Sequence, residues 1–332
     1  MLPWIKFVIC SIALVYCGYK LSYLGDVISE KTHITKTIMG FVLLAIATSA
    51  PEFITSSASV LVVKSPNLAA GDIFGSILIN LGIISILDLI EGKGPIMLKV
   101  QTQHILYAAW TVILLSFICF SMFLNVFKGV GFVLFGMGLD SFILIVLFVI
   151  ALFTIFNMEK NNKGNVSNNQ KIYQDIELKT SVLKFLFYFF IIIGLGIWLS
   201  KIGKEIVIFM GWSDALVGTF FLGIVTSFPE LIVSISALRF NINMAVANIL
   251  GSCFFDIVIV PLCDAFFREG AFLSHISIEN LFTVILSIIL FNIIIVGIIC
   301  RSRRSFLKLG WDAIAIIVTL AGGGLIIALA LR

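Results

Sequence analysis

The sequence predicts an all-α protein that is embedded in a membrane. Of its 332 residues, 60% are hydrophobic and only 12% are charged, and the mean hydropathy is +1.15. Soluble globular proteins have roughly 25% charged residues, so this chain has too little polar surface to cover itself in water. The apolar runs are continuous over roughly 20 residues, as in membrane-spanning helices, whereas the strands of a barrel alternate in polarity over about 10.

Ten apolar segments are long enough to cross a bilayer, and we expect ten transmembrane helices. They cover residues 3–21, 37–63, 67–90, 103–126, 130–156, 181–200, 214–238, 244–266, 278–300 and 309–331. The first segment contains a lone Lys6 and is followed by no clear small-residue cleavage site. We therefore interpret it as a span rather than as a signal peptide.

One long polar stretch, residues 157–180, interrupts this pattern and is rich in Asn and charged residues. It predicts a flexible cytoplasmic linker between a first five-helix unit, 1–156, and a second, 181–332. Placing both termini outside puts most of the 22 Lys and Arg residues on the cytoplasmic side, as the positive-inside rule requires. We expect a multi-pass protein of the plasma (cell inner) membrane.

Two short motifs recur at nearly constant separation along the chain. Thr48–Glu52 reads TSAPE and Thr226–Glu230 reads TSFPE, with their prolines 178 residues apart. The Gly75-Ser76 and Gly251-Ser252 pairs are 176 residues apart. Because each unit has an odd number of spans, the second copy must cross the membrane in the opposite direction. The pattern predicts two inverted five-helix repeats whose broken helices meet at the midplane, a plan found in secondary transporters.

Glu52 and Glu230 lie within spans that are otherwise apolar. An ionisable side chain at this depth costs about 2.5–3.5 kcal/mol on insertion scales, which makes it a functional-site hypothesis. The adjacent prolines each remove a helical hydrogen bond, so we expect the backbone carbonyls of Ala45 and Gly223 to face a cavity. Hydroxyl oxygens come from Thr48, Ser49, Thr226 and Ser227. The alternative is that the two acids are buried carboxyls that only support helix packing.

The third and eighth spans carry a second set of polar side chains. Ser76 and Asn80, like Ser252 and Asp256, are four residues apart and share a helix face. Together with the first set they form a group of hard oxygen ligands, without a His or Cys set suited to zinc. Six to eight oxygens at about 2.3–2.6 Å suit Ca²⁺, and Na⁺ competes for the same ligands. The alternative role is hydrogen bonding between helices, worth about 0.6 kcal/mol per bond.

Residues 45–82 and 223–262 resemble the α-repeats of the sodium/calcium exchanger family, within the calcium:cation antiporter superfamily. The resemblance implies that Glu52 and Glu230 are central ligands shared by Ca²⁺ and Na⁺, and that Asn80 and Asp256 complete the cluster. It implies flanking oxygens from Thr48, Ser49, Ser76, Thr226, Ser227 and Ser252 and from the carbonyls of Ala45 and Gly223. It also implies exchange of several Na⁺ for one Ca²⁺ by alternating access, with the first and sixth spans sliding past a fixed core.

The chain departs from the family pattern at a few positions. Asp72 replaces the usual Asn, which Asn248 retains in the second repeat. Asp72 either adds a fourth acidic group that alters proton sensitivity or ion preference, or faces away and pairs with a hydroxyl. Ile77 and Cys253 replace the Asn of the GSN pattern and make the surroundings less polar.

Two further acids, Asp140 and Asp312, lie near the expected starts of spans. We interpret them as N-terminal helix charges or caps rather than as ligands.

The resulting hypothesis is an antiporter that exchanges Na⁺ for Ca²⁺. An exchanger of Ca²⁺ or another divalent cation for H⁺ on the same fold is the first alternative. A passive cation channel and a membrane scaffold that transports nothing are the others. We expect no enzymatic activity, no cofactor and no nucleic-acid partner. The expected partners are Ca²⁺ and Na⁺ as substrates and the lipid bilayer, with the monomer as the functional unit.

Overall fold

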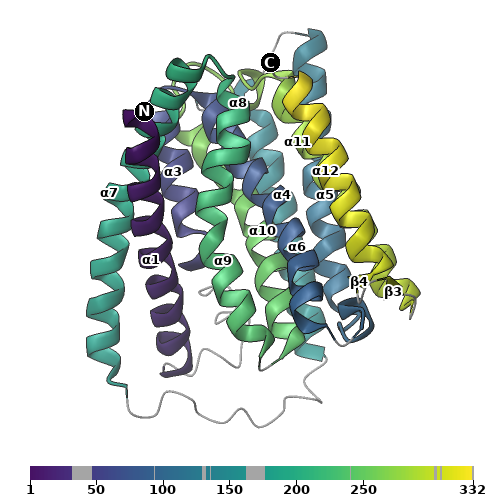
Figure 1. Ribbon diagram of the computed structural model, residues 1–332. Helices are drawn as coiled ribbons and strands as arrows, with labels where there is room; N and C mark the ends of the chain where they lie inside the picture. Colours follow the sequence, from purple (N-terminus) through teal and green to yellow (C-terminus); the bar gives the residue numbers. More distant parts are fainter. Residues whose placement is uncertain are drawn as a thin grey trace.

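The computed structural model describes residues 1–31, 47–92, 94–128, 132–134, 136–161, 176–239, 241–302, 305–306 and 309–330. These residues form an all-helical bundle, in which α1 begins and α12 ends at the same end (Figure 1). The helices are α1 (Leu2–Lys31), α3 (Ala50–Leu61), α4 (Pro66–Glu91), α5 (His104–Lys128), α6 (Leu139–Asn161), α7 (Leu178–Met210), α8 (Asp214–Val217), α9 (Gly223–Leu238), α10 (Ile242–Phe266), α11 (Ile278–Cys300) and α12 (Trp311–Ala330).

Short elements connect some of these helices. Two 3₁₀ turns are η2 (Ile96–Leu98) and η5 (Phe272–Ser274), and η4 (Gly218–Leu222) is a π-helical turn that joins α8 to α9. Two small antiparallel hairpins are β1 (Val133–Leu134) with β2 (Met137–Gly138), and β3 (Ser305–Phe306) with β4 (Leu309–Gly310). The first hairpin leads into α6 and the second into α12.

Eight helices within the described ranges are long and apolar enough to cross a membrane, which makes the chain a multi-pass membrane protein. They are α1, α4, α5, α6, α7, the continuous segment Asp214–Leu238, α10 and α11, and Trp311–Ile326 is a shorter apolar helix. The expected span at 37–63 begins outside the described residues, which resume at Ala47, and its second part is α3.

Some helices are longer than the apolar runs suggested. α1 has 30 residues and α7 has 33, so at about 1.5 Å per residue both exceed the roughly 30 Å of the bilayer core. The turns beyond that length are stable because an α-helix forms its backbone hydrogen bonds internally, whether or not hydrocarbon surrounds it. α6 likewise continues to Asn161 and α7 begins at Leu178, so helix occupies both ends of the expected linker. The middle of that stretch, 162–175, lies outside the described residues.

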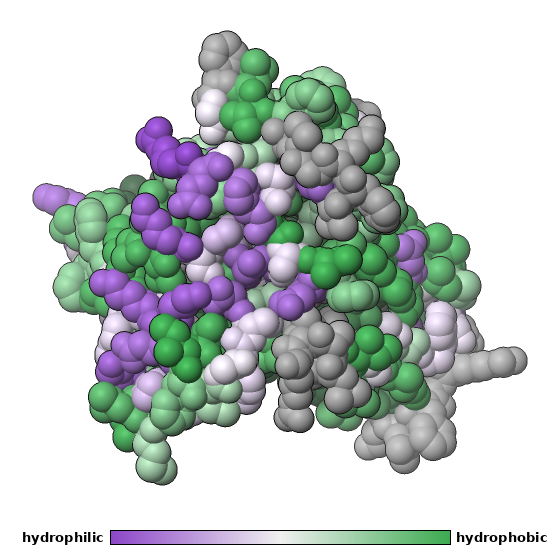
Figure 2. Space-filling model, turned by 90° about the horizontal axis from the view of Figure 1, so that it is seen from above, coloured by the Kyte–Doolittle hydropathy of each residue, from purple (hydrophilic) through white to green (hydrophobic). Residues whose placement is uncertain are grey.

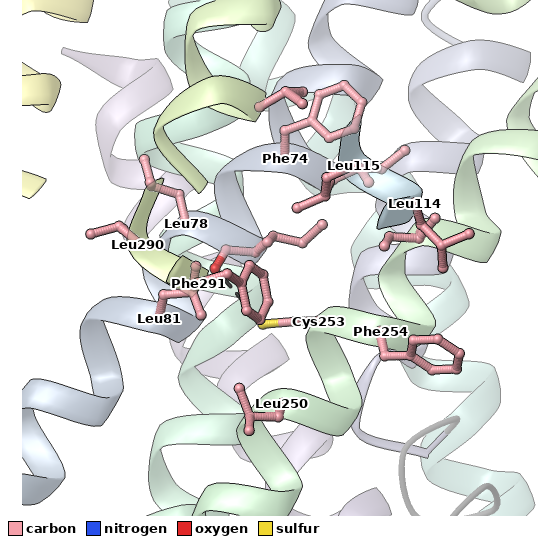
Figure 3. Packing of buried hydrophobic residues seen from close by; sticks show 14 of the residues in the cluster. Phe74, Leu78, Leu81, Leu114, Leu115, Leu250, Cys253, Phe254, Leu290 and Phe291 are labelled. Carbon is pink, nitrogen blue, oxygen red and sulfur yellow. Dashed lines mark hydrogen bonds between the residues drawn. The ribbon is translucent and has the colours of Figure 1, made fainter. Parts of the chain in front are cut away.

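The largest apolar core lies between α4, α5, α10 and α11 (Figure 3). Phe74, Leu115 and Phe291 are fully buried there, and the rings of Phe148 and Phe254 stack with their centroids 4.6 Å apart. α4 and α10 are mostly buried, whereas α1 and α7 pack on each other at the periphery and expose most of their surface. The two helices that carry the second polar set are therefore the central helices of the bundle.

Glycines let α4 cross the η4–α9 segment at backbone contact. A Cβ on Gly75 would lie 2.5 Å from the Cα of Thr219, and one on Gly223 would lie 2.8 Å from the backbone nitrogen of Ser76. Gly71 and Gly218 are equally close to the opposite backbone. Small residues are common where membrane helices approach closely, and here they bring both motif regions together.

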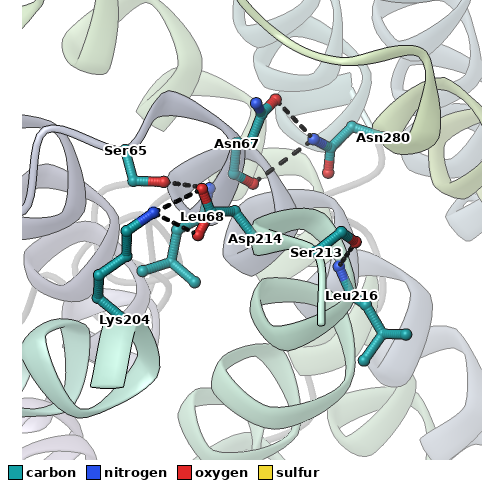
Figure 4. Close-up of polar contacts among 8 residues, drawn as sticks. All are labelled: Ser65, Asn67, Leu68, Lys204, Ser213, Asp214, Leu216 and Asn280. Atoms are coloured by element: carbon teal, nitrogen blue, oxygen red, sulfur yellow. Dashed lines mark hydrogen bonds and ion pairs between the residues drawn. The ribbon is translucent and has the colours of Figure 1, made fainter. Parts of the chain in front are cut away.

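At the end of the bundle where α1 begins, polar residues gather in the centre and toward one side of the face, next to apolar residues (Figure 2). Here Ser65 caps α4 by accepting a hydrogen bond from the Leu68 amide at 3.3 Å (Figure 4). Lys204 of α7 forms an ion pair with Asp214 of α8 at 2.8 Å. These contacts lie at the N-terminal ends of α4 and α8.

Candidate cation-binding site

The first TSxPE motif contains the predicted helix break. Residues 47 and 48 are helical, Ser49 is a bend with φ −82° and ψ 10°, and α3 begins at Ala50. Pro51 is tolerated because the first turn of a helix needs no amide donor there. Glu52 lies in the same turn, where the positive end of the helix dipole favours a carboxylate. The break therefore places a buried acid at a helix N-terminus.

The second motif differs, and the predicted break at Pro229 is wrong. α9 continues from Gly223 to Leu238 through this proline, and the irregular part is the π-helical turn η4 upstream. The hydroxyl of Thr226 lies 3.1 Å from the Leu222 carbonyl and 3.4 Å from the Gly223 carbonyl. Such back-bonding bends a helix without interrupting it. The Gly223 carbonyl is thus already close to a hydroxyl donor.

Hydrogen bonds connect the motif residues of the two halves. The Thr48 and Ser252 hydroxyls are 3.1 Å apart, and the Ser76 hydroxyl lies 3.4 Å from an oxygen of Asp256. Ser227 donates to the Ser76 carbonyl at 3.4 Å. All five side chains are buried. The structure therefore brings together residues that the sequence paired only by motif.

Glu52, Glu230 and Asp256 form a buried acidic group between these contacts. All four carboxyl oxygens of the two glutamates, and Oδ1 of Asp256, lack a hydrogen-bond partner among the described residues. Glu52 is close enough to interact electrostatically with both other acids. The Asn80 amide is also fully buried and has no partner within the same part of the chain. Buried charges and amides without partners are costly, so this arrangement suits a cation that several oxygens share.

Carboxylates alone do not complete such a site. Within the described ranges, no group of three or more His, Cys, Asp and Glu side chains is arranged to hold a metal ion. A cation here must also use hydroxyl and carbonyl oxygens. The hydroxyl of Ser49 is buried beside the Asp256 carboxyl. Ala45, whose carbonyl was predicted to contribute, lies outside the described residues.

Asp72 does pair with hydroxyls, one of which belongs to the predicted site. Its Oδ2 accepts a hydrogen bond from Ser56 at 2.7 Å and its Oδ1 accepts one from Thr226 at 3.2 Å. Its carboxyl also interacts electrostatically with Glu52. In the second half, Asn248 donates to Ser234 at 3.0 Å. The same kind of pair thus occurs in both halves, and only the first carries a carboxylate.

Ile77 and Cys253 are both fully buried in the apolar core, so neither adds a polar side chain to the surroundings of the candidate site. The Cys253 thiol lies 3.8 Å from the Ile77 carbonyl (Figure 3). Asp140 and Asp312 occupy the first turns of α6 and α12, which confirms their predicted position.

Sequence reasoning missed three polar residues. Thr219 of η4 has a buried hydroxyl without a partner in the described part of the chain. A hydroxyl residue beside Gly218 in an otherwise apolar run is the sequence feature that could have pointed to it. Asp88 and Asp264 are fully buried near the ends of α4 and α10 and bind backbone amides. Their separation of 176 residues, equal to that of the glycine-serine pairs, could have revealed them.

The helical fold and buried acidic site define a multi-pass membrane transporter. A family model described as sodium/calcium exchanger protein matches residues 2–158 and 180–321. The chain belongs to this family.

One relative and two solved structures are similar to most of the chain. An uncharacterised membrane protein of Methanocaldococcus jannaschii is 25% identical over 293 residues, which is 86% of this chain and 88% of that protein. The structure of native YfkE has a TM-score of 0.64 at 14% identity, covering 97% of this chain and 91% of that one. The sodium-calcium exchanger NCX_Mj, soaked with 10 mM Na⁺ and zero Ca²⁺, has a TM-score of 0.59 at 20% identity, covering 100% and 99%. These structures share the fold.

Proposed function

We propose that this protein is a secondary active antiporter that exchanges Na⁺ for Ca²⁺ by alternating access. Its family is one of membrane exchangers, which supports cation antiport. The observation that carries the proposal is the group of unpartnered carboxyl oxygens on Glu52 and Glu230, fully buried beside Asp256. Ca²⁺ and Na⁺ compete for the same oxygens, so the occupied site holds one kind of ion at a time. That competition couples the two fluxes.

The proposed ligands are the oxygen atoms that surround this acidic group. Glu52, Glu230, Asp256 and Asn80 form its centre, flanked by Thr48, Ser49, Ser76, Thr226, Ser227 and Ser252 and by the carbonyls of Ala45 and Gly223. Hard oxygen ligands of this kind suit Ca²⁺, and several are neutral, which suits Na⁺ as well. Asp72 acts on this set through Thr226, and Asn248 is its uncharged counterpart.

The proposed architecture consists of ten spans in two inverted five-helix repeats, 1–156 and 181–332, joined by a cytoplasmic linker at 157–180. Two contacts between motif residues of the different halves, Thr48 with Ser252 and Ser76 with Asp256, support this plan. We propose a location in the plasma (cell inner) membrane with both termini outside, contact with the lipid bilayer along the exposed apolar helices, and function as a monomer. No enzymatic activity and no cofactor enter the proposal.

An exchanger of Ca²⁺ or another divalent cation for H⁺ is the second candidate. The fully buried carboxyl of Asp72 favours it, because it adds a fourth acid beside Glu52. Protons neutralise carboxylates as cations do, so the same site supports either counter-ion.

Ca²⁺ uptake by purified protein in proteoliposomes tests these functions. Opposed Na⁺ and pH gradients are applied separately, and the variants are Glu52→Gln, Glu230→Gln and, as a control, the exposed Glu269→Gln. We expect a Na⁺ gradient to drive uptake in the wild type and the control, and both site variants to be inactive. Uptake driven only by a pH gradient would favour the second candidate. Uptake without any counter-ion would indicate a channel, and full activity in both variants would contradict the site.

A further inference from the structure

Two buried aspartates tie the halves of the molecule together reciprocally. Asp88, near the end of α4, accepts hydrogen bonds from the Ile96 amide at 2.6 Å and the Gly310 amide at 2.7 Å. Asp264, near the end of α10, accepts them from the Phe272 and Gly138 amides, both at 2.7 Å. Both aspartates are fully buried. Short hydrogen bonds from N–H groups to a carboxylate belong to the strong class.

Each aspartate thus holds one donor of its own half and one of the other. Ile96 and Phe272 begin the 3₁₀ turns η2 and η5, eight residues after the respective aspartate. Gly310 ends the hairpin before α12, and Gly138 ends the hairpin before α6. Asp88 therefore connects α4 to the second half, and Asp264 connects α10 to the first.

Gly310 and Gly138, which donate to the two aspartates, leave no room for a side chain at these contacts. A Cβ on Gly310 would lie 2.9 Å from the Cβ of Pro95, and a Cβ on Gly138 would lie 2.9 Å from the Cβ of Ala271. The hairpins are therefore packed against the segments that follow α4 and α10. Because the aspartates lie near the ends of α4 and α10, their hydrogen bonds connect these helix ends to hairpins of the opposite half.

The same two helices carry the candidate ligands at a fixed distance from the aspartates. Asn80 precedes Asp88 by eight residues, and Asp256 precedes Asp264 by eight residues. Eight residues of α-helix span about 12 Å, and both helices run unbroken over this stretch, through Pro261 in the case of α10. A displacement at either aspartate is thus transmitted to the ligand on the same helix. Ca²⁺ ligands lie at about 2.3–2.6 Å, so a displacement of about 1 Å disrupts coordination.

We propose that Asp88 and Asp264 are positioning residues of the cation site, which set the axial register of α4 and α10. The proposal rests on the proposed function of that site. It extends to residues that touch no ion and that no motif includes. Each aspartate acts through one backbone amide of the opposite half, so the axial register of its helix depends on that half.

The experiment compares Asp88→Asn, Asp264→Asn and the wild type in proteoliposomes. Asn keeps the size but provides only one acceptor, so one of the two amides loses its partner. We expect the KM for Ca²⁺ to rise about tenfold with a smaller change in the maximal rate, because misplacements of about 1 Å have effects of this order or larger. Hydrogen exchange at the Gly310 and Gly138 amides should accelerate in the matching variant. Glu205→Gln is the control, because this partly exposed acid of α7 pairs with Lys6 and lies on neither central helix.

Asp88→Glu and Asp264→Glu keep the charge and both acceptors but add one methylene group. We expect them to fold and to raise the KM as well, and they decide the question if the Asn variants do not assemble. An unchanged KM in folded Asn and Glu variants, while the wild type transports Ca²⁺, would overturn this proposal alone. A wild-type protein that takes up no Ca²⁺ would instead contradict the proposed function.

Discussion

The hydroxyl of Thr48 lies 3.1 Å from the hydroxyl of Ser252, although 204 residues separate them in the sequence. Thr48 opens the first TSxPE motif, whereas Ser252 belongs to the glycine-serine pair of the other half. The contact therefore joins two different motifs across the halves. Ser76 and Asp256 form a second contact across the halves, at 3.4 Å.

Replacing Thr48 by Val should weaken cation binding while preserving the side-chain shape. The change removes one partner of a buried hydrogen bond, and such a loss costs about 1 kcal/mol, or roughly fivefold in affinity. Ca²⁺ binding to purified protein measures the effect. Ser236→Ala is the control, because that exposed hydroxyl of α9 bonds only to its own helix. Equal affinities in the two variants would show that the Thr48 contact plays no part in binding.

Asp72→Asn should raise the KM for Ca²⁺ more than the KM for Na⁺. A carboxylate interacts twice as strongly with a divalent as with a monovalent cation at the same distance, so its removal affects Ca²⁺ more. Titrations of both ions in proteoliposomes measure this. The double variant Asp72→Asn with Asn248→Asp places the charge at the equivalent position and should restore part of the preference. Parallel changes for both ions would indicate that Asp72 supports only the local fold.

Gly75→Ala and Gly223→Ala should both lower the thermal midpoint strongly or prevent assembly. Each new Cβ would fall within 2.8 Å of backbone atoms of the opposite helix, which cannot move aside as a side chain would. Overpacking of a core costs about 1–3 kcal/mol even against side chains. Thermal unfolding in detergent measures the loss. Gly194→Ala on α7 is the matched control, since its Cβ would meet nothing within 4 Å. A midpoint as high as that of the control would contradict the close crossing.

The ion pair of Lys204 with Asp214 should contribute little to stability. The two side chains are 36% and 22% exposed, and pairs near the surface are worth about 0–1 kcal/mol. Asp214→Asn should therefore lower the thermal midpoint by less than about 4 °C. High salt should reduce even this difference. A larger loss that salt does not affect would mean that the pair is part of a more extensive network.

Much of the candidate site could be predicted because its residues lie in two recurring motifs. Glu52, Glu230 and Asp256 were identified by their charge within apolar runs, and the structure places them in one buried group. Their role as ligands stays a prediction. Asp88 and Asp264 were not identified, because each carries one charge near a span end, which is common in membrane helices. Only their backbone partners distinguish them from other helix-end acids.

Composition and periodicity by themselves determined that this is a multi-pass helical membrane protein with related motifs in its halves. Hydropathy and motif spacing can be read along the chain because they depend on residues close in sequence. Tertiary structure decided what depends on distant partners. α9 continues through Pro229 beside a π-helical turn, Asp72 bonds to Thr226 as well as to Ser56, and Asp88 reaches the hairpin of the other half. A carboxylate accepts from whichever donors the fold brings close to it, and two of these donors, Thr226 for Asp72 and Gly310 for Asp88, lie more than 100 residues away in the sequence.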